Sequence, residues 1–134
     1  MTRRHIFTGS PWEAKAGYAR AVVLTDAGGD WVMVSGCTGF DYVSMTIADD
    51  TVAQAEQAMR NVEAALKEAG AGLDDVVRVT YVFTDDEDFE RAAPVFGRAF
   101  ERARPAAMAI VAGLIDPRMK IEIEVTARLA PDAP

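Results

Sequence analysis

The chain has 134 residues, which is enough for one hydrophobic core, so we expect a single domain over residues 1–134. Half of its residues are hydrophobic and 26% are charged, a composition typical of soluble globular proteins. Its net charge of −7 opposes nonspecific binding to nucleic acid, because such binding depends on Lys and Arg side chains displacing counterions from the phosphates.

Cysteine content and hydropathy indicate the compartment. Cys37 is the single cysteine, so the chain cannot form an internal disulfide, which fits a reducing environment. The arginines near the N-terminus precede no apolar segment of a signal peptide, and no apolar run approaches the length of a membrane span. We therefore expect a cytoplasmic protein without a membrane partner.

The first part of the chain is predicted to form three strands, at residues 5–7, 18–25 and 31–35. These segments are rich in β-branched and aromatic residues. The Gly-Ser-Pro sequence at 9–11 breaks the first strand from the second. The turn at 26–30 contains two glycines, which permit positive φ, so the second and third strands are predicted to form a hairpin.

Residues 51–69 are predicted to form an amphipathic helix, because their apolar side chains recur at alternating spacings of three and four. Thr51 and Gln54 match a capping box at its start. Gly70 suits the position that follows the last helical turn.

The second half continues with a strand at 76–84, a helix with an apolar stripe from Phe89 to Phe100, and strands at 107–112 and 121–129. The order β-β-β-α-β-α-β-β predicts an α+β fold in which two helices cover one face of a mixed sheet. Residues 107–114 are apolar on both sides of their strand. Because a monomer would leave this surface exposed, we expect a homo-oligomer.

The polar face of the last strand carries two carboxylates, Glu122 and Glu124, either of which could be a functional group. A carboxylate within hydrogen-bond reach of a water molecule can serve as a general base. Glu124 lies on the same face, so both side chains could equally serve to protect an exposed sheet edge. The single histidine, His5, is far from Cys37 in the sequence, and we expect neither cysteine catalysis nor a metal or other cofactor.

Several segments, in their order and spacing, resemble the Rid family of reactive intermediate deaminases, also called the YjgF or L-PSP family. The closing segment carries the strongest similarity, since an Arg-Pro-Ala run precedes an apolar strand and an Ile-Glu-Ile-Glu sequence follows it. The matching segments are residues 17–22, 34–36, 57–62, 69–70, 75–80 and 104–128.

This resemblance implies a chorismate-mutase-like fold, assembled as a homotrimeric barrel with the helices outside and a small-molecule cleft between adjacent subunits. In the deaminases of the family, an arginine pairs with the carboxylate of a 2-imino acid and a glutamate directs water to the imine carbon. By register, Glu122 corresponds to that glutamate, Tyr18 to an aromatic residue of the cleft, and Ser35 and Gly36 to the turn beside it.

The resemblance also identifies a departure from the family pattern. Counted back from Leu114, the position of the family arginine is occupied by Ala106. Arg20, Arg104 and Arg118 are candidates to replace it, and Arg118 is preferred because it lies in a turn from which a long side chain can reach inward. The predicted cleft consists of Tyr18, Ser35, Gly36, Cys37, Ala106, Arg118 and Glu122.

Two functions follow from this prediction. The first is an imine or enamine deaminase, or a related hydrolase, with a substrate that does not need the missing arginine. The second is a ligand-binding or sensor trimer without turnover, so whether the chain is an enzyme stays open. RNA cleavage, after which part of the family is named, ranks lower because the chain is acidic and has no pair of histidines.

Overall fold

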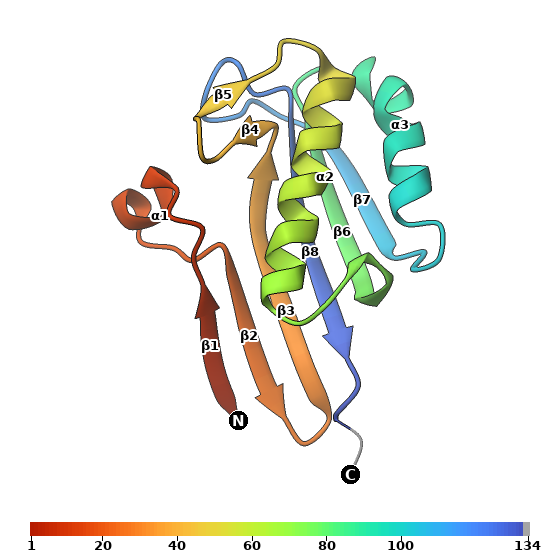
Figure 1. Ribbon diagram of the computed structural model, residues 1–134. Coiled ribbons are helices and arrows are strands. Elements are labelled where there is room, and N and C mark those ends of the chain that lie inside the picture. The colour runs from red at the N-terminus through yellow and green to blue at the C-terminus, as the bar shows by residue number, and fades with distance from the viewer. Residues whose placement is uncertain (133–134) are drawn as a thin grey trace.

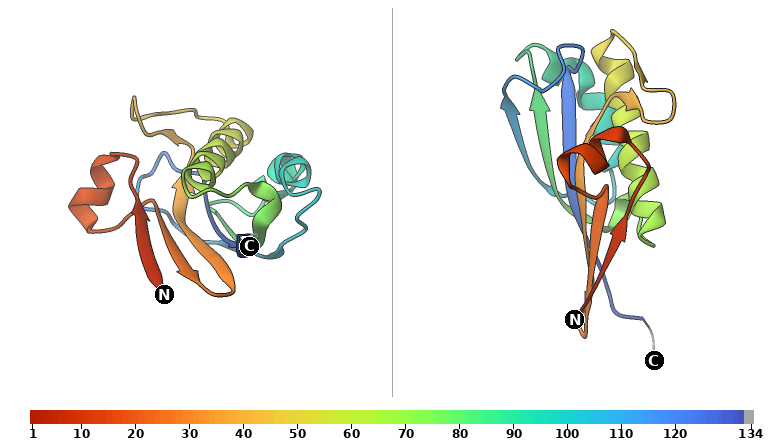
Figure 2. Two further views of the ribbon diagram at one scale, coloured as in Figure 1. Left: turned by 60° about the horizontal axis from the view of Figure 1, so that its bottom comes forward. Right: turned by 90° about the vertical axis from the view of Figure 1, so that its left-hand side faces the viewer.

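The computed structural model describes residues 1–132 and shows an α+β fold with one large mixed sheet (Figure 1). Two long helices pack on the same side of the sheet (Figure 2). The elements are β1 (Thr2–Ile6), α1 (Pro11–Ala16), β2 (Ala21–Asp26), β3 (Gly29–Thr38), β4 (Phe40–Asp41), β5 (Thr46–Ile47), α2 (Thr51–Glu68), the 3-10 helix η1 (Leu73–Asp75), β6 (Val76–Phe83), α3 (Asp88–Ala99), β7 (Ala106–Val111) and β8 (Ile121–Leu129).

The sheet has six strands in the order β1-β2-β3-β8-β6-β7. Every neighbouring pair is antiparallel except β6 and β7, which α3 connects as a parallel crossover. The last strand of the chain therefore lies in the middle of the sheet, between β3 and β6. This central position holds Glu122 between two neighbouring strands.

The hydrophobic core lies between the helices and one face of the sheet. Alternate residues of β8 point into it, and Ile121, Ile123 and Val125 are buried. The apolar stripe of α2, which includes Val62 and Leu66, packs against them. The sequence predicted both features, because apolar residues recur every three or four positions in a helix and every second position in a strand.

Within residues 1–132, no second layer of long helices covers the opposite face of the sheet, as predicted (Figure 2). Met33, Met108 and Ile110 are 38%, 51% and 42% exposed. All six residues of the edge strand β7 are exposed. Exposed apolar side chains gathered on one face are typical of an interaction surface, and the predicted self-association depends on this face.

Four elements differ from the sequence prediction. The segment taken as a break at residues 9–11 begins the helix α1, in which the Ser10 side chain accepts a hydrogen bond from the Trp12 N–H and Pro11 occupies the first position. The short strands β4 and β5 and the 3-10 helix η1 were not predicted. These elements have fewer than seven residues each, too few to show a clear period.

The start of α2 corrects the predicted capping box. The N-cap is Asp50, whose carboxylate accepts from the Ala53 N–H at 2.9 Å. Thr51 instead donates its hydroxyl proton to Asp88 at the start of α3, at 3.0 Å. At the other end, Gly70 has φ of +84° and follows the cap Ala69, as the sequence predicted.

Candidate functional site

Glu122 is the second residue of β8 and lies opposite the irregular end of β3. The register between these strands shifts between Val34 and Cys37, which places Gly36 directly against the glutamate. A Cβ atom at Gly36 would lie 2.8 Å from Cδ of Glu122. The missing side chain of Gly36 therefore provides the space in which the carboxylate lies.

A cavity of about 310 Å³ opens in front of Glu122. Its walls come from α1, the bulge of β3, the turn after β4 and the loop between β7 and β8. The lining residues are Trp12, Ala16, Tyr18, Gly36, Thr38, Tyr42, Ile115, Met119 and Glu122. Among these residues Glu122 alone is charged, so the cavity is an aromatic and apolar space with one carboxylate.

Burial raises the pKa of Glu122 above its usual range; Arg20 acts in the opposite direction, and Glu124 adds to the increase. Its carboxylate forms no hydrogen bond to any group of residues 1–132. The ionised form is therefore more basic than an ordinary glutamate and keeps its lone pairs available to a water molecule or ligand.

Arg20 lies behind the cavity and is 1% exposed. Its Nη1 donates to the Gly36 carbonyl at 2.8 Å. The guanidinium carbon lies 4.5 Å from the ring centroid of Tyr42 and 5.7 Å from that of Tyr18. Arg20 thus links the bulge of β3 to two aromatic walls of the cavity, although its side chain is not part of the lining.

Glu13 connects the helix α1 to this arginine. It is 4% exposed, and its Oε2 lies 3.8 Å from Nε of Arg20. The Thr8 N–H donates to the same carboxylate at 3.0 Å, and the Thr8 hydroxyl donates to it as well. This buried network holds α1 in place, and α1 carries Trp12 to the cavity.

Of the residues predicted from the sequence, the structure brings Tyr18, Gly36 and Glu122 together in this cavity. Ser35 is adjacent, but its hydroxyl donates to the Ala19 carbonyl at 2.5 Å. Cys37 is fully buried and packs in the core, and burial raises the pKa of its thiol to about 11. A thiol with this pKa is protonated near neutral pH, which disfavours a nucleophilic role.

Ala106 and Arg118 do not line the cavity in a single chain. Ala106 of β7 pairs with Arg78 of β6. The β7 residue in line with Glu122 is Ile110, because both pair with the same residue of β6; Ile110 lies roughly 13 Å along the strand from Ala106. Nη2 of Arg118 lies 2.7 Å from Asp116, and its guanidinium also stacks on Phe40. A role for Ala106 beside Glu122 therefore requires a neighbouring protomer.

The sequence reasoning missed Trp12, Tyr42 and Met119 as wall residues. For Trp12 a signal exists, because Ser10-Pro11 followed by Glu13 is typical of a helix start. Tyr42 lies in a turn that no periodicity marks, and the Thr38 N–H donates to its hydroxyl at 3.0 Å. Its place at the cavity depends on contacts that the local sequence does not encode.

Two further properties concern residues 1–132 only. They contain no group of three or more His, Cys, Asp or Glu side chains placed to hold a metal ion. No helix within this described part of the chain has the length and apolar character needed to cross a membrane.

Comparison with known proteins places these features in a family context. Residues 8–129 match the family model described as Endoribonuclease L-PSP. Protein DfrA of Myxococcus xanthus is 35% identical over 128 residues, which cover 95% of this chain and 96% of that protein. The human 2-iminobutanoate/2-iminopropanoate deaminase is 30% identical over 132 residues, covering 98% and 93%.

The fold has equally clear relatives among solved structures. A member of the YjgF/YER057c/UK114 family from Mycobacterium tuberculosis superimposes with a TM-score of 0.84 at 36% sequence identity. The match covers 96% of this chain and all of that chain. The similarity thus extends over the whole domain, including the strands that surround Glu122.

Proposed function

Because the chain belongs to the Rid family, also called the YjgF or L-PSP family, we propose that it hydrolyses a small imine or enamine in the cavity of Glu122. The observation that carries this proposal is a single carboxylate of raised pKa at an aromatic cavity, without a hydrogen-bond partner in residues 1–132. The relative named as a 2-iminobutanoate/2-iminopropanoate deaminase supports the reaction class.

Glu122 acts as the general base in this reaction. It accepts a proton from a water molecule while the water oxygen forms a bond to the imine carbon and the C=N π electrons move to nitrogen. The Glu122 carboxyl returns this proton to the nitrogen, which gives a neutral carbinolamine. Glu122 then accepts the carbinolamine hydroxyl proton and passes it to the amino group, so that the oxygen electron pair forms the C=O bond while the C–N bond breaks and releases ammonia and a carbonyl product. An enamine enters the same sequence by tautomerisation, in which its β-carbon gains a proton and its nitrogen loses one.

The substrate is proposed to be neutral and apolar. The cavity presents Trp12, Tyr18 and Tyr42 to the ligand, and none of its lining residues is a cation. A 2-imino acid would bring its carboxylate into this space without a guanidinium to pair with. The alanine at position 106 supports the same substrate class.

We further propose that the working form is a homotrimer in the cytoplasm, with a neighbouring protomer closing the cavity. The uncovered sheet face and the exposed strand β7 support self-association. The fully buried single cysteine is compatible with a reducing compartment.

The first prediction concerns substrate choice and Glu122. A neutral imine, generated in place by an amine oxidase, should decay faster with the protein than without it, and by a larger factor than 2-iminobutyrate made by an amino-acid oxidase. Glu122→Gln should abolish the acceleration because an amide cannot accept the proton from water. The wild-type rate should rise with pH through a pKa above that of ordinary glutamate, because burial opposes ionisation.

Glu124→Gln provides the matched control, since Glu124 lies two residues further on the same face of β8 and is exposed. At a pH above the pKa of Glu122, where that carboxylate is ionised in both proteins, it should leave the decay rate close to that of the wild type. An acceleration that survives in Glu122→Gln would show that the proposed base is wrong.

A binding or sensor trimer without turnover is the second candidate, favoured by the predominance of aromatic walls in the cavity. It predicts that neutral aromatic ligands raise the melting temperature while no imine decays faster. RNA cleavage ranks third, because the cavity offers no Lys or Arg side chain to a phosphate.

A further inference from the structure

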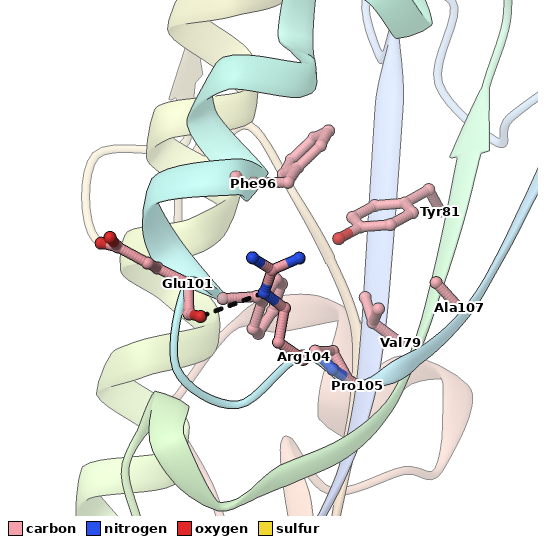
Figure 3. Close-up of a pocket in the computed structure, with 9 residues that line it drawn as sticks. Val79, Tyr81, Phe96, Glu101, Arg104, Pro105 and Ala107 are labelled. Atoms are coloured by element: carbon pink, nitrogen blue, oxygen red, sulfur yellow. Dashed lines mark hydrogen bonds between the residues drawn. The ribbon is translucent and has the colours of Figure 1, made fainter.

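A second pocket, of about 350 Å³, lies between the C-terminal end of α3 and the strands β6 and β7 (Figure 3). It is lined by Val79, Tyr81, Phe96, Gly97, Phe100, Glu101, Arg104, Pro105 and Ala107. None of these residues lines the cavity of Glu122. The two sites also lie on opposite faces of the sheet, because Tyr81 points into the helix-covered core whereas Glu122 does not.

Tyr81 supplies one polar group to this pocket. The residue is 6% exposed, yet its hydroxyl forms no hydrogen bond within the described residues 1–132. Burial raises the pKa of Tyr81 to about 12, so the phenol keeps its proton. Figure 3 shows the hydroxyl directed into the pocket, toward Arg104. A donor that faces a pocket and has no protein partner is a group to which a ligand can hydrogen-bond.

Arg104 supplies the second polar group. Its backbone N–H donates to the Phe100 carbonyl at 3.0 Å, and its φ of +46° is unusual for a residue other than glycine. The side chain turns back toward α3, where Nε donates to the Glu101 carbonyl at 3.2 Å. Figure 3 shows the two terminal nitrogens pointing into the pocket, and they pair with no carboxylate of residues 1–132.

Glu101 also belongs to the lining, but Figure 3 shows its carboxylate directed away from Arg104 and Tyr81. The other walls are apolar. Val79, Phe96, Phe100 and Pro105 surround the polar groups, and the small side chain of Ala107 leaves room between them. Tyr81 and Phe96 stack with ring centroids 4.4 Å apart, which fixes the orientation of the phenol. The pocket therefore combines a guanidinium, a phenol donor and an aromatic enclosure.

We propose that this pocket binds a small monocarboxylate with an apolar body, whose carboxylate pairs with Arg104 and accepts the Tyr81 hydroxyl proton. The planar guanidinium presents two parallel N–H donors that match a carboxylate. A doubly charged phosphate fits less well, because Arg104 is the only cation of the lining and the negative end of the α3 dipole lies beside it. This site is independent of the proposed hydrolysis, because it uses other residues on the other face of the sheet.

The probe that tests the proposal is phenylacetate, with phenylacetamide as its neutral isostere, titrated into the full chain and followed by ¹H–¹⁵N NMR. Phenylacetate should give saturable shifts around Tyr81 and β7, and phenylacetamide should not. Arg104→Gln should weaken binding by about tenfold or more, and Tyr81→Phe by about threefold or more, because each removes a donor to the carboxylate. Ala107→Leu should abolish binding by filling the pocket.

Arg102→Gln is the matched control, since Arg102 lies in the same loop, is 84% exposed and pairs with Asp74 at 3.7 Å. It should bind phenylacetate as the wild type does, and so should Glu122→Gln, which separates this site from the proposed hydrolysis. Absence of saturable binding through the millimolar range, or wild-type affinity in Arg104→Gln, would overturn the proposal.

Discussion

The backbone of Gly36 lies so close to Glu122 that no side chain fits between them. Cδ, Cγ and Oε1 of Glu122 lie 2.8, 3.0 and 3.1 Å from the position of a Cβ atom at Gly36, which is closer than side-chain atoms normally approach. Gly36 does not have positive φ, so its backbone would accept another residue. The glycine is therefore required for space and not for conformation.

A methyl group at position 36 should displace the Glu122 carboxylate. We expect Gly36→Ala to lower kcat/KM for imine hydrolysis by about a hundredfold, because displacement of a catalytic group by about 1 Å has effects of this order. Steady-state kinetics on the folded variant measures this. Gly113→Ala is the control, since a Cβ atom there has no neighbour within 4 Å. Unchanged kinetics in Gly36→Ala would contradict the placement of Glu122 in the mechanism.

The burial of Arg20 could not be predicted from the sequence. The sequence made it one of three arginines that could replace the family arginine, and the structure buries it between Glu13, Gly36 and Tyr42. Its charge is offset by Glu13 and it opposes the rise in the pKa of Glu122. Arg20 thus affects the cavity in two ways: it holds the residues around it in place, and its positive charge favours the ionised form of Glu122.

The helix α2 holds the β7–β8 loop, which forms one wall of the cavity, through hydrogen bonds of Gln54. This side chain is fully buried and donates to the carbonyls of Ala48 at 2.7 Å and Arg118 at 2.9 Å. It also accepts from the Lys120 N–H at 2.8 Å. The capping role predicted for Gln54 was wrong, because the side chain turns inward and bonds to the backbone of the β7–β8 loop and of the segment before α2.

Replacing Gln54 with a similar apolar side chain should test this role. Gln54→Met should lower the free energy of unfolding by about 3 kcal/mol, because three partly buried backbone groups lose their partner. Urea denaturation measures the change. Glu63→Met, at an exposed position of the same helix, is the control and should change stability little. Equal stability of the two variants would mean that water replaces the amide without cost.

The sheet of the whole molecule has one face that the two long helices leave uncovered. The exposed side chains of Met33, Met108 and Ile110 lie on this face, and β7 is a fully exposed edge strand. An uncovered edge invites association with another chain. The proposed trimer would bury this surface and bring β7 of one protomer close to another.

A charge on this face should therefore prevent assembly. Ile110→Asp should convert the oligomer to monomers, because burying an unpaired carboxylate in an apolar interface is strongly unfavourable. Sedimentation velocity measures the molecular mass. The rate of imine hydrolysis should fall in the monomer, because the neighbouring protomer that closes the cavity is lost. Val43→Asp, at a position that is 96% exposed in the turn after β4, should assemble normally. A monomeric wild-type protein would refute the proposed trimer.

The sequence by itself determined the family, the order of the long elements and the two faces of the sheet. These properties depend on local periods, such as the stripe of α2 and the alternation of β8, and on segments that match a family in order. Glu122 and Gly36 were both predicted as cleft residues because they lie in segments that match the family.

The tertiary structure alone decided the walls of the cavity, the burial of Arg20 and the pocket of Tyr81 and Arg104. Each of these joins residues distant in the sequence, such as Trp12 with Glu122 and Tyr81 with Arg104. Side-chain periodicity reports which face of an element is buried, but it does not report which other element meets that face. The long-range packing of the chain supplies that information, and it is this packing that sets the burial and the pKa of Glu122.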